Sequence, residues 1–405
     1  MRETEIPEGY KQTELGVIPN DWEVQLVGQC FEVFNNLRYP ISEEVRKKKF
    51  GDYPYYGPTK IQGYIDEYRV EGEYALIGED GDHFLKWREL SMTLLVKGKF
   101  NVNNHAHLVK GTKNLTQWFY YYFCHRELTP YLTRQGAGRY KLTKNALLQI
   151  PCVIPPTLKE QKAIAQSLSD VDALITECDR IITKKRNTKQ GTMQQLLTAQ
   201  KRLPGFSGEW EVKQLGEMSL VSSGGTPNRN NPSYWNGNIP WITTSQIDFN
   251  TITSPDEFIT EIGLNNSSAK IYDEGTLLMA MYGQGKTRGK VAILGIKATT
   301  NQACASIRLY QLTSNKYVFF YLSHKYDEIR KLSNNGNQEN LNGEIIKSIR
   351  IPIPPLTEQK AIAQILSDMD TEITALEQKR DKYKAIKQGM MQELLTGKTR
   401  LISSS

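Results

Sequence analysis

The chain has 405 residues, of which 39% are hydrophobic, and a formal net charge of +7. This length exceeds one ordinary hydrophobic core and predicts two domains with connecting elements. No apolar run of about eighteen residues is present, and the first five residues lack the apolar stretch of a secretion signal, so neither a membrane span nor export is expected. Five scattered cysteines without a C-x-x-C pair argue against a disulfide framework and a zinc site, and favour a reducing, cytoplasmic setting.

The first predicted domain begins with NDWEV at residues 20–24 and is mainly β-structure. Short β-branched and aromatic runs separated by Gly, Pro and Asn predict strands, and SMTLLV at 91–96 is one of them. A helix is expected over about 115–134. The segment IPCVIPP at 150–156 predicts a strand that its prolines keep out of the centre of a sheet.

A long helix is predicted to follow, because residues 157–198 contain no proline and a single glycine. Forty helical residues make a rod of roughly 60 Å. Thr157 and Glu160 have the spacing of a capping box at its start. The apolar positions fall at steps of 4, 3, 4, 3 and 4, which is a heptad seam: Ile164, Leu168, Val171, Ile175, Cys178 and Ile182. Such a seam is too narrow to wrap a globular core but suits a partner helix.

The second half follows the same order. It opens with GEWEV at 208–212, has clear strands at 276–280 and 290–294, and is expected to form a helix over about 315–332. A proline-punctuated strand at 351–355 precedes a second long helix that runs to Thr396 without the capping box. Its seam residues are Ile362, Leu366, Met369, Ile373 and Leu376.

The two long helices are copies of each other. The sequence EQKAIAQ at 160–166 returns at 358–364, 198 positions later, and the register then holds without a gap as far as LLT at 196–198 and 394–396. Two unrelated exposed helices would not share both seam and register, so an antiparallel coiled coil is favoured. The predicted fold is α+β, with two β-rich domains separated by two long paired helices and a pseudo-two-fold internal repeat. The expected segments are domain 1 (1–156), helix 1 (157–200), domain 2 (201–355) and helix 2 with the C-terminal tail (356–405).

One motif suggests nucleotide chemistry. AMYGQGKT at 280–287 follows a strand and fits a relaxed phosphate loop, but such a loop needs a helix after it. Here a strand follows, so a tight hairpin that projects Lys286, Arg288 and Lys290 is favoured over a nucleoside triphosphatase.

Other catalytic signatures are absent from the sequence. The histidines have no metal-ligand spacing, and His105 and His107 fit a structural role on one face of a strand better than a metal site. No G-x-S-x-G, G-x-G-x-x-G, catalytic Cys/His or base-holding methyltransferase motif is present. The chain is therefore expected to have no catalytic residues and no metal.

Polar and basic residues mixed with aromatics cluster on predicted loops of both domains. Arg and Lys suit guanine edges and phosphates, whereas Asn and Gln suit adenine. One such cluster alone is more often a solvated loop, but clusters occur at corresponding places in both domains. The candidate DNA-binding residues are Lys86, Arg88, Lys97, Asn104, His105, Arg134, Arg139, Tyr140, Lys141, Arg229, Thr243, Thr244, Ser245, Gln246, Gln284, Lys286, Arg288, Asn301, Gln302, Asn337 and Gln338.

These features together resemble the DNA-specificity subunit of type I restriction-modification systems. The resemblance rests on GVIPNDWEV at 16–24, LPGFSGEWEV at 203–212, and the two IPP…EQKAIA segments that open the long helices. YPYYGP at 53–58 and YWNGNIPWI at 234–242 look like openings of the family's target-recognition domains. The order of segments matches the family over nearly the whole chain.

The resemblance implies that each β-rich domain is a target-recognition domain for one half of a bipartite, asymmetric DNA target. The helices would act as a ruler and dock two modification subunits, which carry S-adenosylmethionine and methylate adenine at N6, together with restriction subunits that use ATP and Mg²⁺. The chain itself would bind double-stranded DNA, no cofactor and no membrane. Because residues 11–22 resemble the linker at 201–210, the N-terminal segment is expected near the end of the second helix.

Two other functions stay open at this point. A non-catalytic coiled-coil scaffold with two protein- or glycan-binding heads would show no salt-dependent DNA binding, whereas a DNA reader would lose affinity steeply with salt. A triphosphatase that uses Lys286 would turn over nucleotide in the isolated chain.

Overall fold

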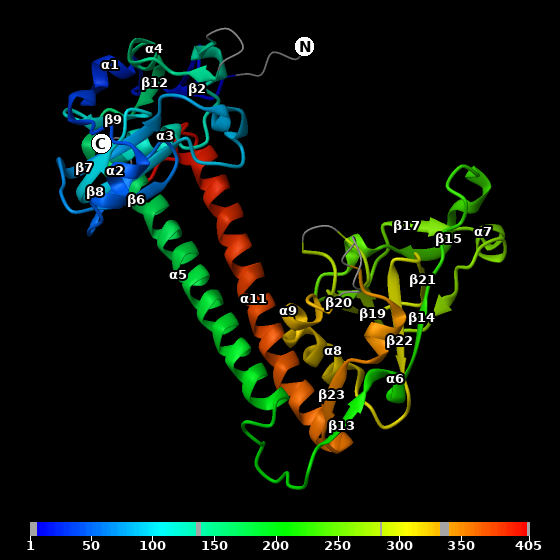
Figure 1. The fold of residues 1–405 in the computed structure, drawn as a ribbon. Helices are drawn as coiled ribbons and strands as arrows, with labels where there is room; N and C mark the ends of the chain where they lie inside the picture. The colour runs from blue at the N-terminus through cyan, green and yellow to red at the C-terminus, as the bar shows by residue number, and fades with distance from the viewer. Residues whose placement is uncertain (1–5, 135–138, 284–285, 333–339, 403–405) are drawn as a thin grey trace. The chain divides into compact units, whose positions relative to one another are not determined.

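Two long helices run through the structure, a computed structural model that describes residues 6–134, 139–283, 286–332 and 340–402. Helix α5 spans Leu158–Leu197 and helix α11 spans Leu356–Leu394 (Figure 1). The chain divides into unit 1, with residues 1–179 and 378–405, and unit 2, with residues 180–377. Each unit therefore holds the first half of one long helix and the second half of the other. The segment limits expected from the repeat remain a prediction.

The two helices pair antiparallel within each unit. In unit 1, Lys387 Nζ lies 2.6 Å from Asp172 Oδ1, and in unit 2, Lys189 Nζ lies 2.5 Å from Asp370 Oδ1. The two ion pairs are counterparts under the 198-residue repeat, and each joins α5 to α11. The predicted α+β fold with an antiparallel helix pair is confirmed.

The seam residues are enclosed as expected, with one correction. Val171, Ile175, Met369 and Leu376 are half-buried, and the other seven residues of the two seams are buried. The seam does more than contact a partner helix, because its first turns enter globular cores. Ile164 and Leu168 pack with core residues of unit 1, and Ile362 and Leu366 pack with those of unit 2. The expectation that the seam stays outside a globular core is wrong at these helix starts.

Head 1, defined as residues 6–154, is built around a six-stranded sheet with the order β4-β9-β7-β8-β5-β6. Neighbouring strands are antiparallel, except that β5 runs parallel to β8. The elements of head 1 are β1 (Tyr10–Thr13), β2 (Gly16–Pro19), β3 (Glu23–Leu26), α1 (Val27–Cys30), β4 (Phe31–Val33), η1 (Asn35–Leu37), α2 (Glu43–Lys48), β5 (Tyr53–Tyr56), β6 (Ile61–Ile65), β7 (Val70–Gly78), η2 (Asp82–Lys86), β8 (Thr93–Val102), β9 (Ala106–Gly111), α3 (Thr116–Phe123), η3 (Thr129–Tyr131), β10 (Thr133–Arg134), β11 (Tyr140–Lys141), α4 (Lys144–Leu148) and β12 (Pro151–Ile154).

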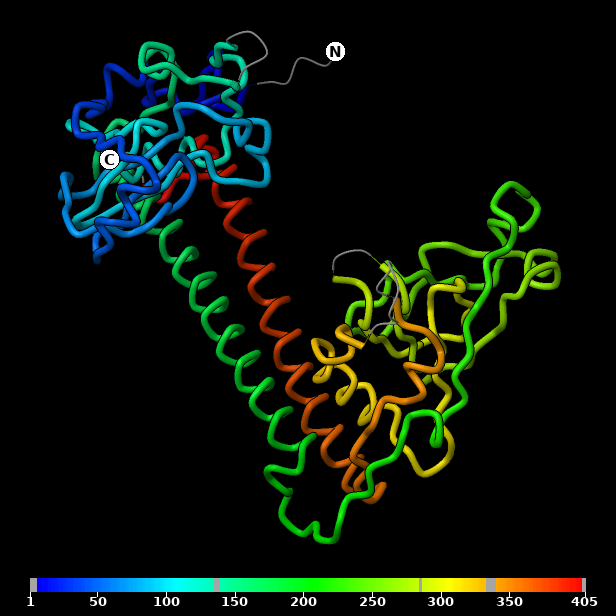
Figure 2. The backbone as a smooth tube through the Cα atoms, viewed as in Figure 1, coloured from blue at the N-terminus to red at the C-terminus, as the bar shows by residue number. Residues whose placement is uncertain are grey.

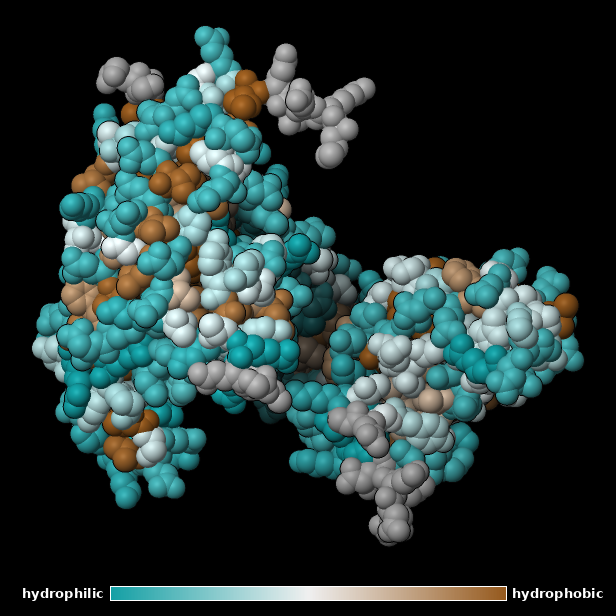
Figure 3. Space-filling model, turned by 90° about the horizontal axis from the view of Figure 1, so that it is seen from above, coloured by the Kyte–Doolittle hydropathy of each residue, from teal (hydrophilic) through white to brown (hydrophobic). Residues whose placement is uncertain are grey.

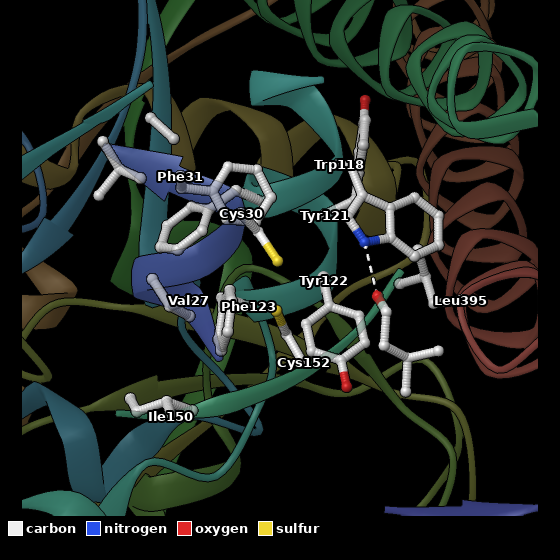
Figure 4. Packing of buried hydrophobic residues seen from close by; sticks show 14 of the residues in the cluster. Val27, Cys30, Phe31, Trp118, Tyr121, Tyr122, Phe123, Ile150, Cys152 and Leu395 are labelled. Carbon is white, nitrogen blue, oxygen red and sulfur yellow. Dashed lines mark hydrogen bonds between the residues drawn. The ribbon is translucent and has the colours of Figure 1, made fainter. Parts of the chain in front are cut away.

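The central strand β7 is buried on both faces, as successive side chains of a strand point to opposite sides. Ala75 and Ile77 belong to the main core of unit 1 with helix α3, whereas Leu76 belongs to a second cluster on the other face. In the main core, Trp118 Nε1 of α3 donates a hydrogen bond to the Val153 carbonyl of β12 at 2.9 Å (Figure 4). The head, the start of α5 and the end of α11 therefore share one core.

Head 2, defined as residues 211–353, contains a five-stranded sheet with the order β14-β22-β19-β20-β16 and a separate four-stranded sheet with the order β17-β15-β21-β18. Its elements are β13 (Glu211–Gln214), α6 (Leu215–Met218), β14 (Ser219–Ser223), η4 (Pro232–Tyr234), β15 (Trp235–Ile242), η5 (Thr244–Gln246), β16 (Thr251–Ile252), β17 (Glu257–Ile259), α7 (Glu261–Asn265), β18 (Ile271–Tyr272), β19 (Leu277–Ala280), β20 (Val291–Leu294), β21 (Ala298–Thr300), β22 (Cys304–Leu309), α8 (Asn315–His324), α9 (Tyr326–Ile329), α10 (Gly343–Lys347) and β23 (Arg350–Ile353).

The two heads share one scaffold although their sequences diverge. The order β4-β9-β7-β8-β5 in head 1 matches β14-β22-β19-β20-β16 in head 2, including the parallel pairing of the last two strands. Each scaffold is followed by a helix, α3 or α8, and by a short strand, β12 or β23, which pairs with β3 or β13 in a two-stranded sheet. The heads differ in the additions: α2 and β6 in head 1, and the four-stranded sheet in head 2.

Two expected helices are shorter than predicted. The helix expected over 115–134 ends at Phe123, and Pro130, the second residue of η3, is itself incompatible with an α-helix that continues to 134. The helix expected over 315–332 is divided into α8 and α9 by Lys325, whose backbone (φ −88°, ψ 9°) lies outside the α-helical range.

The first described residues and the segment after α11 lie side by side in unit 1. Figure 2 shows the blue and red parts of the tube together in this unit. Tyr10 donates from its hydroxyl to the Gly397 carbonyl at 3.0 Å, so the predicted position of the N-terminal segment beside the end of the second helix is confirmed. Hydrophilic residues dominate the visible surface of each unit, with hydrophobic residues scattered among them (Figure 3). Within the described residues, no helix combines the length and apolarity that crossing a membrane requires.

Candidate nucleic-acid interface

The candidate residues of the two heads lie mainly in loops that correspond through the shared scaffold. Three pairs of loops correspond: 79–92 and 281–290, 103–105 and 295–303, and 124–143 and 325–342. Arg229 and residues 243–246 lie in the segment between β14 and β16, which corresponds to residues 34–52 of head 1. Gln284, Asn337 and Gln338 lie outside the described residues.

In head 1, the structure brings candidate residues from two loops together around Glu79 and Asp80. Lys141 Nζ lies 3.3 Å from Glu79 Oε1, and His105 Nδ1 lies 2.8 Å from Asp80 Oδ2. Asp80 also bridges to Lys141 through the backbone. The short β10–β11 hairpin, with Arg134, exposed Arg139 and Tyr140, is thereby held beside the β8–β9 turn.

A buried network of polar side chains holds Glu79 in place. Arg38 Nη1 lies 2.7 Å from Glu79 Oε2, and its Nη2 lies 2.8 Å from His107 Nδ1. Since Arg38 can only donate, His107 must be neutral with its proton on Nε2, which donates to the Leu142 carbonyl at 2.7 Å. Burial lowers the pKa of His107, in agreement with the neutral form. The structural role expected for this histidine is confirmed.

The remaining candidates of head 1 are more dispersed. Lys86 and Arg88 are exposed, and the Arg88 guanidinium lies 4.8 Å from the centre of the Trp87 ring. Asn104 is exposed in the β8–β9 turn. Lys97 lies on β8 and pairs with Glu73 of β7 at 2.7 Å, so it stands on the sheet rather than in a loop.

In head 2, Arg229 is held by aromatic rings. Its guanidinium carbon lies 3.8 Å from the centre of the Trp235 ring and 4.6 Å from that of Trp241, and it forms an ion pair with Glu257. The Arg229 ion pair lowers the pKa of Glu257. Arg229 is therefore a positioned cation on the head-specific sheet.

The other polar candidates of head 2 form local hydrogen bonds. Thr243 and Ser245 share a hydroxyl hydrogen bond of 2.6 Å beside Thr244, and Gln246 Nε2 donates to the Ser254 carbonyl at 3.0 Å. Asn301 Oδ1 accepts from the backbone of Ala303, and exposed Gln302 accepts from Thr226. These contacts order the loops and leave the side chains at the surface.

The glycine-rich motif at 280–287 joins two antiparallel strands, β19 and β20. The predicted hairpin is therefore confirmed, and the strand β20 follows where a phosphate loop requires a helix. The prediction that it projects three cations is wrong for two of them. Arg288 is buried and donates to the Arg330 carbonyl at 2.9 Å, and Lys290 pairs with Asp248 at 2.6 Å. Lys286 is exposed.

A basic run that sequence reasoning missed lies in α2 and just after it. Arg46, Lys47, Lys48 and Lys49 precede Phe50, whose side chain is 78% exposed. Four consecutive cations are a sequence signal that points to a polyanion. Beside them is a pocket of about 420 Å³, lined by residues 40–43, Arg46, Tyr55, Gln62 and 103–105.

Nothing in the described part of the chain gathers three His, Cys, Asp or Glu side chains that could hold a metal ion. The five cysteines are buried. Burial raises the pKa of Cys124 and Cys304 to about 12, which leaves these thiols protonated and unsuited to nucleophilic attack.

The repeated Glu-Gln pair at the start of each long helix is buried and joins the halves of each unit. Gln161 Oε1 accepts from the Leu115 backbone at 2.8 Å, and Gln359 Oε1 accepts from the Ser314 backbone at 2.8 Å, so each anchors the helix to its head. Of the two hydrogen bonds of a capping box, the structure shows one: the Glu160 backbone N–H donates to Thr157 Oγ1 at 3.2 Å.

The two glutamates instead bind arginines that follow the other helix. Arg400, after α11, donates to Glu160 at 2.5 Å and 3.0 Å, and Arg202, after α5, donates to Glu358 at 2.6 Å and 2.7 Å. Arg400 also forms two hydrogen bonds to Asp21 at 2.9 Å and 3.0 Å, which lower the pKa of Asp21. The helix ends are thus tied to each other twice, once in each unit.

Comparison with known proteins shows what the chain is similar to. The family model described as "Type I restriction modification DNA specificity domain" matches residues 19–187 and 207–387. A putative type I restriction enzyme MjaX specificity subunit from Methanocaldococcus jannaschii is 26% identical over 97% of both chains. A putative type I restriction enzyme specificity subunit from Haemophilus influenzae is 29% identical over 87% of this chain and 90% of its own. The crystal structure of a type I restriction-modification S subunit from M. genitalium matches the fold with a TM-score of 0.66 at 12% identity, covering 96% of this chain and 98% of that one.

Proposed function

The chain belongs to the family of type I restriction-modification DNA specificity subunits, and we propose that each of its heads reads one half of a bipartite, asymmetric DNA target. One observation carries this proposal. The two heads share a sheet scaffold but bear different additions and different polar loops at equivalent places. One scaffold with two loop sets fits two related tasks with different targets, as two unlike half-sites require.

In this proposal the chain recognises the DNA target, and partner subunits catalyse the reactions. Two modification subunits would dock on the paired helices, because the internal repeat offers two equivalent surfaces, one in each unit. These subunits would hold S-adenosylmethionine and methylate adenine at N6 on a flipped base. Restriction subunits that use ATP and Mg²⁺ would complete the assembly, and the chain itself would hold no cofactor. We expect the complex to act on DNA in the cytoplasm.

The helices would also set the length of the unread spacer. Helix α5 has 40 residues, which corresponds to roughly 60 Å. Half-sites on one side of B-DNA lie about 34 Å apart per helical turn, and a rod of this size can bridge them.

Exchange of residues 25–150 for the first head of another family member tests the proposal. Genome methylation mapping should then show one half-site changed and the other half-site and the spacer retained. Changes in both half-sites, or in neither, would contradict it.

Salt dependence separates DNA reading from the scaffold alternative. Binding of the complex to its target duplex should weaken steeply as salt rises, because phosphate contacts release counterions. A scaffold for protein or glycan would show no such DNA binding.

A further inference from the structure

The pocket of head 1 is lined in part by α2 and β6, the additions that head 2 does not have. It is lined by residues of α2, the β5–β6 hairpin and the β8–β9 turn. In head 2, the corresponding segments hold β15, β17 and β18 of the additional sheet. Residues that make one head read a different sequence from the other must lie where the heads differ. The pocket meets this condition.

Arg46 is held in this pocket by a backbone carbonyl and an aromatic ring. Its Nη1 donates to the Ile41 carbonyl at 3.0 Å, and its guanidinium carbon lies 4.9 Å from the centre of the Tyr55 ring. Tyr55 is buried and fixed by hydrogen bonds to the backbone of Tyr39 (2.6 Å) and Ile41 (3.2 Å). Arg46 is therefore preorganised, with donors left for a ligand.

The hydrogen bonds also determine the orientation of the Gln62 amide. The His105 backbone N–H donates to Asn103 Oδ1 at 2.9 Å, so the other end of the Asn103 amide must be its nitrogen. That nitrogen donates to Gln62 Oε1 at 3.0 Å, which leaves Gln62 Nε2 as the available end. Gly57 makes room for this amide, because a Cβ at Gly57 would come within 2.3 Å of Gln62 Nε2.

Both fixed polar groups thus present N–H donors. The major-groove edge of guanine offers two acceptors, N7 and O6, and no donor, whereas the edges of adenine and cytosine each carry an amino donor. Glu43 at the pocket forms an ion pair with Lys47 at 2.8 Å, which offsets its repulsion of phosphate. The neighbouring cations Lys47 and Lys48 are exposed on α2 and suit the DNA backbone.

We propose that this pocket reads a guanine in the half-site of head 1, with Arg46 and Gln62 as the specificity-determining residues. The inference rests on the proposed function and assigns one base and two side chains to it. Arg46 would form the bidentate contact to N7 and O6, and Gln62 would donate a further hydrogen bond to the same edge. Asn104, exposed in the adjoining turn, would contact the neighbouring base pair.

The test uses the complete methyltransferase complex and a duplex library randomised over the half-site of head 1, which the head exchange identifies. The wild-type complex should require guanine at one position. Arg46→Gln and Arg46→Lys should both relax the preference at that position by roughly 5- to 150-fold, because lysine keeps the charge but not the bidentate geometry. Gln62→Ala should relax the same position.

Lys48→Gln is the matched control, since it removes one exposed positive charge from the same helix and leaves the Glu43–Lys47 ion pair in place. It should weaken binding about equally for all sequences and leave base preference unchanged. Thermal unfolding of the Arg46 variants and of Lys48→Gln should be alike, which separates lost recognition from lost folding. A half-site of head 1 without guanine, or an unchanged preference in folded Arg46→Gln, would overturn the inference. A wild-type complex without any sequence preference would instead refute the proposed function.

Discussion

Removal of the Arg400 guanidinium should loosen unit 1 at the start of α5. Arg400 is 22% exposed and binds Glu160, whose side chain is 2% exposed, together with Asp21, which is 40% exposed. Removing one partner of a buried ion pair leaves an unpaired charge, at a cost of about 3–5 kcal/mol. Partial access of water reduces this, so Arg400→Ala should lower the free energy of unfolding of unit 1 by about 2–4 kcal/mol.

The measurement is chemical denaturation of the full chain, combined with hydrogen exchange of backbone amides. Exchange should accelerate in residues 158–170 of unit 1 and stay unchanged in the equivalent residues 356–368, which Arg202 still holds. Lys398→Ala is the control, because it removes an exposed charge from the same tail and should change stability by less than about 0.5 kcal/mol.

Glu160→Gln in the Arg400→Ala background tests the cause. Neutralising the unpaired charge should recover part of the lost stability. If Arg400→Ala matches the wild type within about 0.5 kcal/mol, or if Glu160→Gln destabilises it further, the buried ion pair does not hold the helix start.

Three further outcomes are expected. Four residues inserted after Asn187 add about one helical turn, so methylation mapping should show a changed spacer between unchanged half-sites; an altered half-site would count against the ruler. Burial lowers the pKa of His107 below its ordinary value of 6.5, so the folded state loses stability relative to the unfolded state as the pH falls below 6.5. The melting temperature of His107→Gln should therefore depend less on pH between 7.5 and 5.5 than that of the wild type, and an identical pH dependence would refute this origin. Lys286→Ala should weaken DNA binding and reduce its salt slope by about 1; nucleotide turnover in the wild-type chain that this change abolishes would restore the triphosphatase interpretation.

The sequence was sufficient for the parts of the fold that repeat. The matched heptads of α5 and α11 predicted an antiparallel pair, and the Asp172–Lys387 and Lys189–Asp370 ion pairs bear this out. The common scaffold of the heads was not predictable in detail, because the additions between its strands differ in length and kind. Hydrophobic alternation identifies a strand but not its neighbour in a sheet.

The candidate site shows a similar division. The sequence indicated that the candidate residues lie in corresponding loops of the two heads. It did not indicate which individual cations are exposed and which are buried or paired. Arg288 is buried because the carbonyl of Arg330, 42 positions away, accepts its hydrogen bond. Arg46 was overlooked because its importance depends on Tyr55 and on a pocket that only the folded sheet creates.

The joints between heads and helices suggest how such a protein can acquire new targets. Gln161 and Gln359 bind backbone amides of the heads, and Trp118 and Tyr317 bind backbone carbonyls of the strands before the helices. Hydrogen bonds to main-chain atoms do not depend on side-chain identity in the partner segment, so they persist when the side chains there are replaced. Recombination between genes could therefore graft a foreign head onto these helices without redesign of the joint, and evolution could combine half-sites freely.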